Sequence, residues 1–220
     1  MLRILGILLF AVWSHADRPI TMFNSSTVPS FQIAGMDRMI PRWISGDMDN
    51  FKLIKESAVL SSSDLFVDAG CNHGFYTFYA AAIGMRVGCF EIQPGMIKLL
   101  YKSMAENGFQ GKVSIHHVGV SNTSGYSGVH FAGGLSHLVE GRGEKCRVLP
   151  LDRMVKEPAR FLKIDVEGNE IVALQGIHAQ TCKAVYTSTP SNLTSDTTPY
   201  YCLTRCSQTH VLLRCGLSPH

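Results

Sequence analysis

The ten residues from Phe161 to Glu170, FLKIDVEGNE, constrain the fold of this chain more than any other stretch. An apolar run ends in an acid, passes through a glycine turn that carries further acids, and leads directly into an amphipathic helix. This order is typical of a buried parallel strand that is followed by a crossover helix. Ligands of open α/β sheets bind at the carboxyl ends of such strands. We therefore expect Asp165 and Glu167 to lie at a ligand site.

A second strand, glycine turn and helix come earlier in the chain. The run DLFVDAG at residues 64–70 is followed by CNHG, and a helix is expected from Phe75 to Ile83. Glycines let a backbone approach a ligand closely, and the first amide groups of a helix attract negative charge. The turn reads Gly-x-Asn-x-Gly, with Asn72 where the dinucleotide fingerprint has its middle glycine.

A third feature is an acid at the end of the next expected strand. The strand runs from Gly84 to Glu91, so its last residue lies 23 positions beyond Asp68. A carboxylate near that offset can accept hydrogen bonds from the ribose hydroxyls of an adenosine. Pro94 then begins a helix, and another strand follows from Lys112 to Val118.

The order of these strands and helices along the chain predicts the fold class. Three strand–helix units and a fourth strand predict an α/β fold: a doubly wound, mostly parallel sheet with helices on both faces. A helix from Asp47 to Leu60 is expected to pack against the sheet, which is the commoner role, or to cover the ligand as a lid. The glycine-rich residues 124–150 predict a hairpin or flap, in which His137, Arg142 and Lys145 are candidate substrate contacts. After Gly176 the periodicity fades, and only short strands at 183–187 and 210–213 are expected.

The sequence of residues 162–170 also resembles that of a known family. LKIDVEGNE followed by a helix and Leu-x-Gly closely resembles the signature of the FkbM family of S-adenosylmethionine-dependent methyltransferases, and the resemblance covers about residues 60–177. It implies a Rossmann-like, class I methyltransferase fold whose C-terminal strands are here divergent or truncated. It implies S-adenosyl-L-methionine as the cofactor, with its methionyl part held by Asp68, Gly70, Asn72 and Gly74, its ribose by Glu91, and its adenine by Val118 and Gly119.

The resemblance also suggests how the acids would act. Methyl transfer from a sulfonium is an in-line displacement, so alignment matters most: orientation accounts for about 7–11 kcal/mol and a positioned base for roughly 10²–10⁴-fold. Asp165 or Glu167 takes the proton of the acceptor, or else orients the cofactor ammonium group or a substrate hydroxyl. We expect Asp165 to orient and Glu167 to act as the base. Glu170, in the first turn of a helix, is favoured there by the helix dipole.

The ends of the chain differ from the middle. Residues 1–16 combine a positive start, an apolar run and a small-residue ending, which predicts a signal peptide and a secreted or secretory-pathway protein. The run is shorter than the roughly 20 residues that span a bilayer. A buried N-terminal helix and an uncleaved anchor are the alternatives. An irregular segment is expected at 17–46, a methyltransferase-like domain at 47–182 and a divergent tail at 183–220.

The seven cysteines fall into two groups. Those expected in the α/β core, Cys71, Cys89 and Cys146, are predicted to behave as small buried apolar residues. Those near the C-terminus, Cys182, Cys202, Cys206 and Cys215, could pair in a secretory lumen in any of three ways. No spacing resembles a zinc site, so no metal is predicted.

The composition of the chain limits the kinds of binding partner that are expected. A net charge of +3, with 17% charged residues and no basic run, argues against nucleic-acid binding. No membrane span is expected beyond the leader, and the sequence does not predict the oligomeric state. The function predicted is O-methylation of a hydroxyl on a glycan or small metabolite. The alternatives are a catalytically inactive secreted binding module and a nicotinamide-dependent oxidoreductase, which Asn72 and the lack of a Tyr-x-x-x-Lys pair disfavour.

Overall fold

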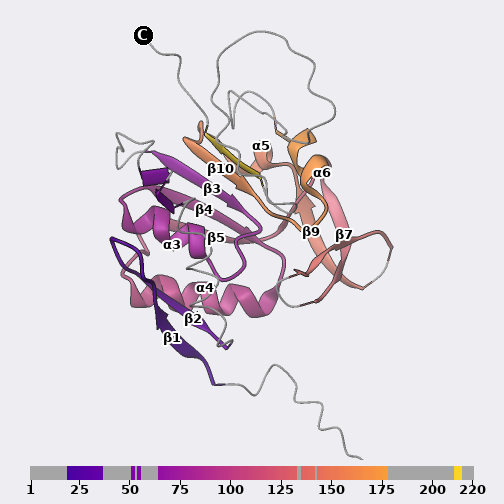
Figure 1. The fold of residues 1–220 in the computed structure, drawn as a ribbon. Helices are drawn as coiled ribbons and strands as arrows, with labels where there is room; N and C mark the ends of the chain where they lie inside the picture. The colour runs from indigo at the N-terminus through magenta and orange to yellow at the C-terminus, as the bar shows by residue number, and fades with distance from the viewer. Residues whose placement is uncertain are drawn as a thin grey trace, which may run out of the picture.

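The centre of the protein is a sheet of five strands in the order β11-β10-β3-β4-β5 (Figure 1). In the computed structural model, the described residues are 19–36, 51–52, 54–55, 64–132, 135–141, 143–177 and 211–214. The sheet consists of β3 (Leu65–Ala69), β4 (Arg86–Glu91), β5 (Val113–His117), β10 (Phe161–Ile164) and β11 (Val211–Arg214). The first four are parallel and β11 is antiparallel to β10, which confirms the predicted mostly parallel sheet.

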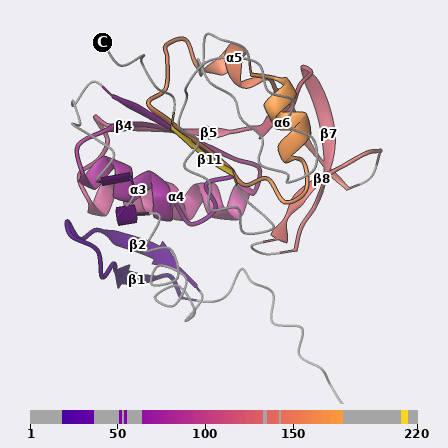
Figure 2. The same ribbon diagram turned by 45° about the horizontal axis from the view of Figure 1, so that its top comes forward.

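Helices cover both faces of this sheet (Figure 2). One face carries α3 (Phe75–Ala82) and α4 (Pro94–Glu106), and the other carries α5 (Leu151–Met154) and α6 (Glu170–Gln175). Side chains alternate along each strand, so that Phe66 packs on the α3 side and Val67 on the α6 side. No helix within the described ranges is long and apolar enough to cross a membrane.

The N-terminal segment corrects one expectation. We expected irregular chain over residues 17–46, yet β1 (Thr21–Asn24) and β2 (Gln32–Gly35) form an antiparallel hairpin. The Ala34 N–H donates to Ser103 Oγ at 2.8 Å, and the side chain of Asn107 bonds both the N–H and the carbonyl of Gln32. The hairpin is therefore stabilised by α4, about seventy residues away in the chain, and local patterns do not contain that information.

Part of the helix expected at 47–60 is described. Residues 51–52 and 54–55 are helical, and Phe51 and Ile54 are fully buried. The Phe51 ring stacks on Tyr79 with centroids 4.6 Å apart and meets Tyr76 edge-on at 5.2 Å. These residues therefore have a packing role, but the ring contacts of Phe51 are to helix α3 and not to a strand of the sheet. The rest of the predicted helix lies outside the described ranges.

A second sheet continues from the end of β5. Its strands are β6 (Gly119–Val120), β7 (Gly125–His130), β8 (His137–Val139) and β9 (Glu144–Leu149), in the order β6-β9-β7-β8. The predicted flap is thus confirmed as the β7–β8 hairpin, and β9 joins it by pairing antiparallel with β7. Since β8 is at one edge of this sheet, it pairs with a single strand, β7, among those that the structure describes.

The C-terminal expectations are only partly covered. The strand predicted at 210–213 is present as β11, with Leu213 opposite Leu162. The strand predicted at 183–187, the leader at 1–16 and the four C-terminal cysteines all lie outside the described residues.

One charged pair is buried between the central strands. Lys163 of β10 lies opposite Asp68 of β3, both on the α3 side of the sheet, and the side chains are 4% and 0% exposed. Lys163 Nζ is 3.2 Å from Asp68 Oδ1 and donates to the Gly70 carbonyl at 2.8 Å. Thr77 Oγ1 of α3 donates to the other Asp68 oxygen at 2.7 Å. Each charge therefore depends on the other, because both side chains are shielded from solvent.

We predict that Lys163→Met lowers the free energy of unfolding by about 3–5 kcal/mol, since it leaves Asp68 buried and unpaired. The double variant Lys163→Met/Asp68→Asn should recover part of that loss, because the buried charge is then removed. Lys102→Met, which breaks the exposed Lys102–Glu106 pair of α4, should change the value by about 0.5 kcal/mol or less. Urea titrations followed by circular dichroism compare the three, and equal losses at Lys163 and Lys102 would contradict the prediction.

Candidate cofactor site

A cleft opens at the carboxyl ends of β3, β4, β5 and β10, as predicted for a sheet of this kind. Seven of the nine predicted site residues line it: Gly70, Asn72, Glu91, Val118, Gly119, Asp165 and Glu167. The two that do not line it are Asp68 and Gly74. Asp68 is fully buried beneath the cleft against Lys163 and Thr77, so its carboxylate positions the strand ends and does not face a ligand.

The glycines of the turn serve the packing of the protein itself. Gly70 has φ +78°, and a Cβ at this position would overlap the backbone carbonyl of Asp165. Gly74 has φ +84°, and its Cβ would overlap the side chains of Phe78 and Leu100. We expected these glycines to allow a ligand to approach. The structure shows that Gly70 lets the end of β3 approach the end of β10, and that Gly74 lets α3 begin close to α4.

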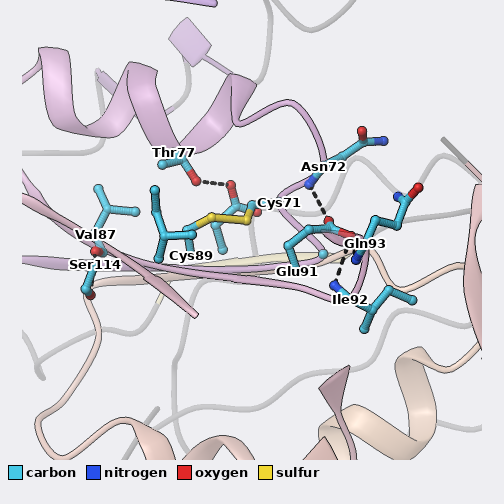
Figure 3. The surroundings of a disulfide bond; sticks show 12 residues. Cys71, Asn72, Thr77, Val87, Cys89, Glu91, Ile92, Gln93 and Ser114 are labelled. Carbon is cyan, nitrogen blue, oxygen red and sulfur yellow. Dashed lines mark hydrogen bonds between the residues drawn. A yellow bond between two sulfur atoms is a disulfide. The ribbon is translucent and has the colours of Figure 1, made fainter. Parts of the chain in front are cut away.

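Glu91 is held in a cradle of backbone amides. Its carboxylate accepts hydrogen bonds from the N–H groups of Asn72 at 2.8 Å and of Ile92 and Gln93 at 2.9 Å (Figure 3). The residue is 3% exposed, and burial raises the pKa of Glu91 above its usual value although the amide bonds lower it. The end of β4 and the turn after β3 are therefore joined through this carboxylate.

A disulfide between Cys71 and Cys89 joins the same two elements (Figure 3). We predicted that these cysteines would be separate buried apolar residues, and that prediction is wrong. Cys71 follows Gly70 in the turn, and the turn brings its Cα to 5.7 Å from that of Cys89 on the neighbouring strand. Eighteen residues separate the two cysteines in sequence, so only the strand register reveals the pairing. Cys146 is buried, as predicted, and forms no disulfide within the described residues.

Two residues of the cleft carry side-chain oxygens without a hydrogen-bond partner in the described part of the chain. Asn72 Oδ1 and Asp165 Oδ1 are buried and have no hydrogen-bond donor among the described residues. The other Asp165 oxygen is 3.5 Å from Lys163 Nζ, which fixes the orientation of the carboxylate. Asn72 itself is held with φ +48°, a conformation that non-glycine residues seldom adopt. Buried acceptors of this kind normally have a donor, so both fit a ligand that carries N–H groups.

The turn after β10 displays Glu167. This residue has φ +53°, and Glu170 closes the turn by accepting hydrogen bonds from the N–H groups of Val166 and Gly168. The pKa of Glu167 is raised, first by burial and then by the charges of Asp165 and Glu170, while Lys163 and His137 partly offset the rise. Glu170 thus has a structural role, and Glu167 is left as a carboxylate that holds a proton more readily than usual.

The remaining wall of the cleft, around Gly119, is apolar and closely packed. A Cβ at Gly119 would lie 3.0–3.3 Å from side-chain atoms of Val148, Leu138 and Ile92, so these side chains would have to shift by a few tenths of an ångström to accept it. The space enclosed at this part of the cleft measures about 40 Å³. Leu138 belongs to β8, the edge strand of its sheet.

A larger, polar groove adjoins the cleft. It measures about 480 Å³ and shares Val120 and Leu138 with the cleft. Asn169, two residues after Glu167, lies in its wall and donates to the Leu138 carbonyl at 3.4 Å. Of the candidate substrate contacts, His137 and Lys145 line neither hollow, and Arg142 lies outside the described residues.

Sequence reasoning missed several residues of the site. Lys163 was given no role, although a lysine in a four-residue apolar strand that ends in an acid indicates a buried ion pair. Gln93, Ser136 and Leu138 line the cleft without any sequence pattern that marks them.

Comparison with solved structures finds partial likenesses. They include a putative transferase from Pyrococcus horikoshii (14% identity, 47% of this chain and 39% of that chain, TM-score 0.35). A tRNA m1G37 methyltransferase from M. jannaschii is 16% identical over 46% of this chain and 29% of that chain, with a TM-score of 0.34. A SAM-dependent methyltransferase from Agrobacterium tumefaciens is 12% identical over 44% and 32%, with a TM-score of 0.37. The chain thus spans less than two fifths of each of these proteins.

No curated protein sequence matches the chain. Its residues 68–190, from the acid near the end of β3 to beyond α6, match the sequence model of the methyltransferase FkbM domain. That match covers more than half of the chain and includes every residue that we placed at the cleft. The chain therefore belongs to the FkbM methyltransferase family.

Proposed function

We propose that this chain binds S-adenosyl-L-methionine in the cleft and transfers its methyl group to a hydroxyl of a glycan or a polyhydroxylated small metabolite. The observation that carries the proposal is the pair of buried oxygens on Asn72 and Asp165 that have no partner among the described residues. A methionyl ammonium group offers three N–H donors and a positive charge, which suits both acceptors.

The chemistry of the other lining residues supports the same cofactor. Glu91 would accept hydrogen bonds from the ribose hydroxyls of an adenosine, and Val118, Gly119 and Ile92 would flank its adenine. The acids Glu91, Asp165 and Glu167 line the cleft, and no lysine or arginine does so among the described residues. A negative cleft favours a cationic ligand over a neutral one. When bound, the cofactor supplies an electrophilic methyl group on a sulfonium.

The residues of the chain then have separate roles. Lys163 fixes one oxygen of Asp165, so that the other is directed to the ligand. Glu167 would accept the proton of the acceptor hydroxyl at its carboxylate as the methyl carbon exchanges its bond to the sulfonium sulfur, which leaves as a neutral thioether, for a bond to that oxygen. Its raised pKa suits a base that must hold this proton. Most of the acceleration comes from alignment, worth about 7–11 kcal/mol, and less from the base.

The groove next to the cleft supports the acceptor class. Asn122, Asn169 and Glu140 provide donors and acceptors, and Tyr126, 74% exposed, provides an aromatic face. Amides and an open aromatic ring suit the hydroxyls and the C–H face of a sugar. Glu140 is the one charged residue among the described lining residues, so the groove favours a neutral acceptor over an anion.

The two alternative functions predict different ligand binding. A catalytically inactive binding module would bind the cofactor or a glycan without turnover, and a nicotinamide-dependent oxidoreductase would bind a dinucleotide. Asn72 occupies the place of the middle glycine that a dinucleotide turn uses, which disfavours the second.

The first test is calorimetric titration with S-adenosylmethionine and, separately, with NADH. We expect the folded chain to bind the former, and Glu91→Gln to weaken that binding about tenfold or more by removing a charged acceptor. Glu106→Gln, an exposed carboxylate of α4, is the matched control and should leave the affinity unchanged. A folded wild type that binds no S-adenosylmethionine would overturn the proposed function.

The second test concerns the base. Glu167→Gln should lower turnover about 10²–10⁴-fold while leaving cofactor affinity within a factor of about two. A base works only when deprotonated, so wild-type turnover should rise as pH increases through the raised pKa of Glu167. That rise should vanish in the variant. A variant that keeps both its turnover and its pH profile would show that another group accepts the proton.

The third test concerns the groove. Saturation-transfer NMR with neutral methyl hexosides should show contact to the wild type, and Tyr126→Ala should abolish it by removing the stacking face. Tyr101→Ala, at an exposed tyrosine of α4, is the control. Hexose phosphates should bind no better than the neutral sugars. Contacts that persist in Tyr126→Ala, or a preference for the phosphates, would place the acceptor elsewhere.

A further inference from the structure

The Cys71–Cys89 bond lies between the two elements that form the candidate cofactor site. Cys71 stands between Gly70 and Asn72, which both line the cleft, and Cys89 stands two residues before Glu91. Figure 3 shows the crosslink beside the hydrogen bond from the Asn72 amide to the Glu91 carboxylate. The covalent bond and the amide cradle therefore constrain the same short turn.

The backbone conformation of this turn is intrinsically unfavourable. Three of its five residues, Gly70, Asn72 and Gly74, have positive φ, and Asn72 does so with a side chain. Such a conformation is unfavourable for non-glycine residues, so an untethered turn populates other conformations. A ligand that binds such a turn must order it, and the conformational entropy lost in doing so lowers the affinity. A turn that is already ordered avoids this cost.

We propose that the Cys71–Cys89 disulfide is a positioning device that holds the cofactor turn in its binding conformation, so that full cofactor affinity requires oxidative folding. This inference rests on the proposed function, because it concerns the same site. In forming the bond, the two thiols lose two protons and two electrons, and a disulfide of the folding compartment accepts them and becomes two thiols.

Burial makes the crosslink a fixed feature of the folded protein. Cys71 is 3% and Cys89 0% exposed, so a dissolved thiol cannot reach either sulfur without local opening. The bond must therefore form during folding. Disulfides persist in oxidising compartments, which agrees with the secretory location predicted from residues 1–16. The reducing cytosol would leave the turn untethered.

The experiment compares S-adenosylhomocysteine affinity by calorimetry in full-length wild type and in Cys71→Ala/Cys89→Ala. We expect the double variant to bind about tenfold or more weakly, with unchanged circular dichroism, because the turn must now be ordered by the ligand. Val87→Ala is the matched control, since Val87 is buried two residues before Cys89 on β4. It should lower the melting temperature but leave the affinity unchanged.

A second measurement applies if the double variant does not fold. Wild type is folded in parallel with dithiothreitol and with oxidised glutathione, and non-reducing peptide mapping gives the fraction linked between Cys71 and Cys89. The fraction that binds S-adenosylhomocysteine should follow the linked fraction. Free thiols at both positions after oxidative folding, or equal affinity with and without the bond, would overturn this role. A crosslinked wild type that binds no S-adenosylhomocysteine would instead overturn the proposed function, and this role with it.

Discussion

The rest of the site depends on the interactions of one buried group, the ammonium group of Lys163. It is buried between Asp68 and Asp165 and also donates to the Gly70 carbonyl. Burial alone would lower the pKa of Lys163, but the two carboxylates raise it above the ordinary value, so the group stays charged. One cation therefore joins the ends of β3 and β10 and orients the acid that faces the cleft.

The same region shows why close approach of the backbone matters. Gly70 leaves room for the Asp165 carbonyl, and without that room β3 and β10 could not end side by side. Three further connections hold the turn after β3: the disulfide, the Glu91 cradle and the hydrogen bonds from Gly70 and Cys71 to the Phe90 carbonyl. A site built in this way is arranged before a ligand arrives, which limits the entropy lost on binding.

The strands that build the site could be predicted from the sequence, because their patterns are local. FLKIDVEGNE fixed a strand, a turn and a helix start, and the offset between Asp68 and Glu91 located the second acid correctly at the cleft. The β1–β2 hairpin, the disulfide and the burial of Asp68 depend on contacts between distant segments. The Asn107 bonds to Gln32 and the pairing of Cys71 with Cys89 become visible only when the strand register is known.

The cleft and the groove are mechanically connected, and this bears on how two ligands would meet. Leu138 of β8 lines both hollows, and its carbonyl accepts a hydrogen bond from Asn169 in the turn that carries Glu167. A ligand in either hollow would therefore contact the same side chain, Leu138. If a ligand displaced Leu138 from one hollow, the affinity of the other would change, and by linkage that effect would be reciprocal.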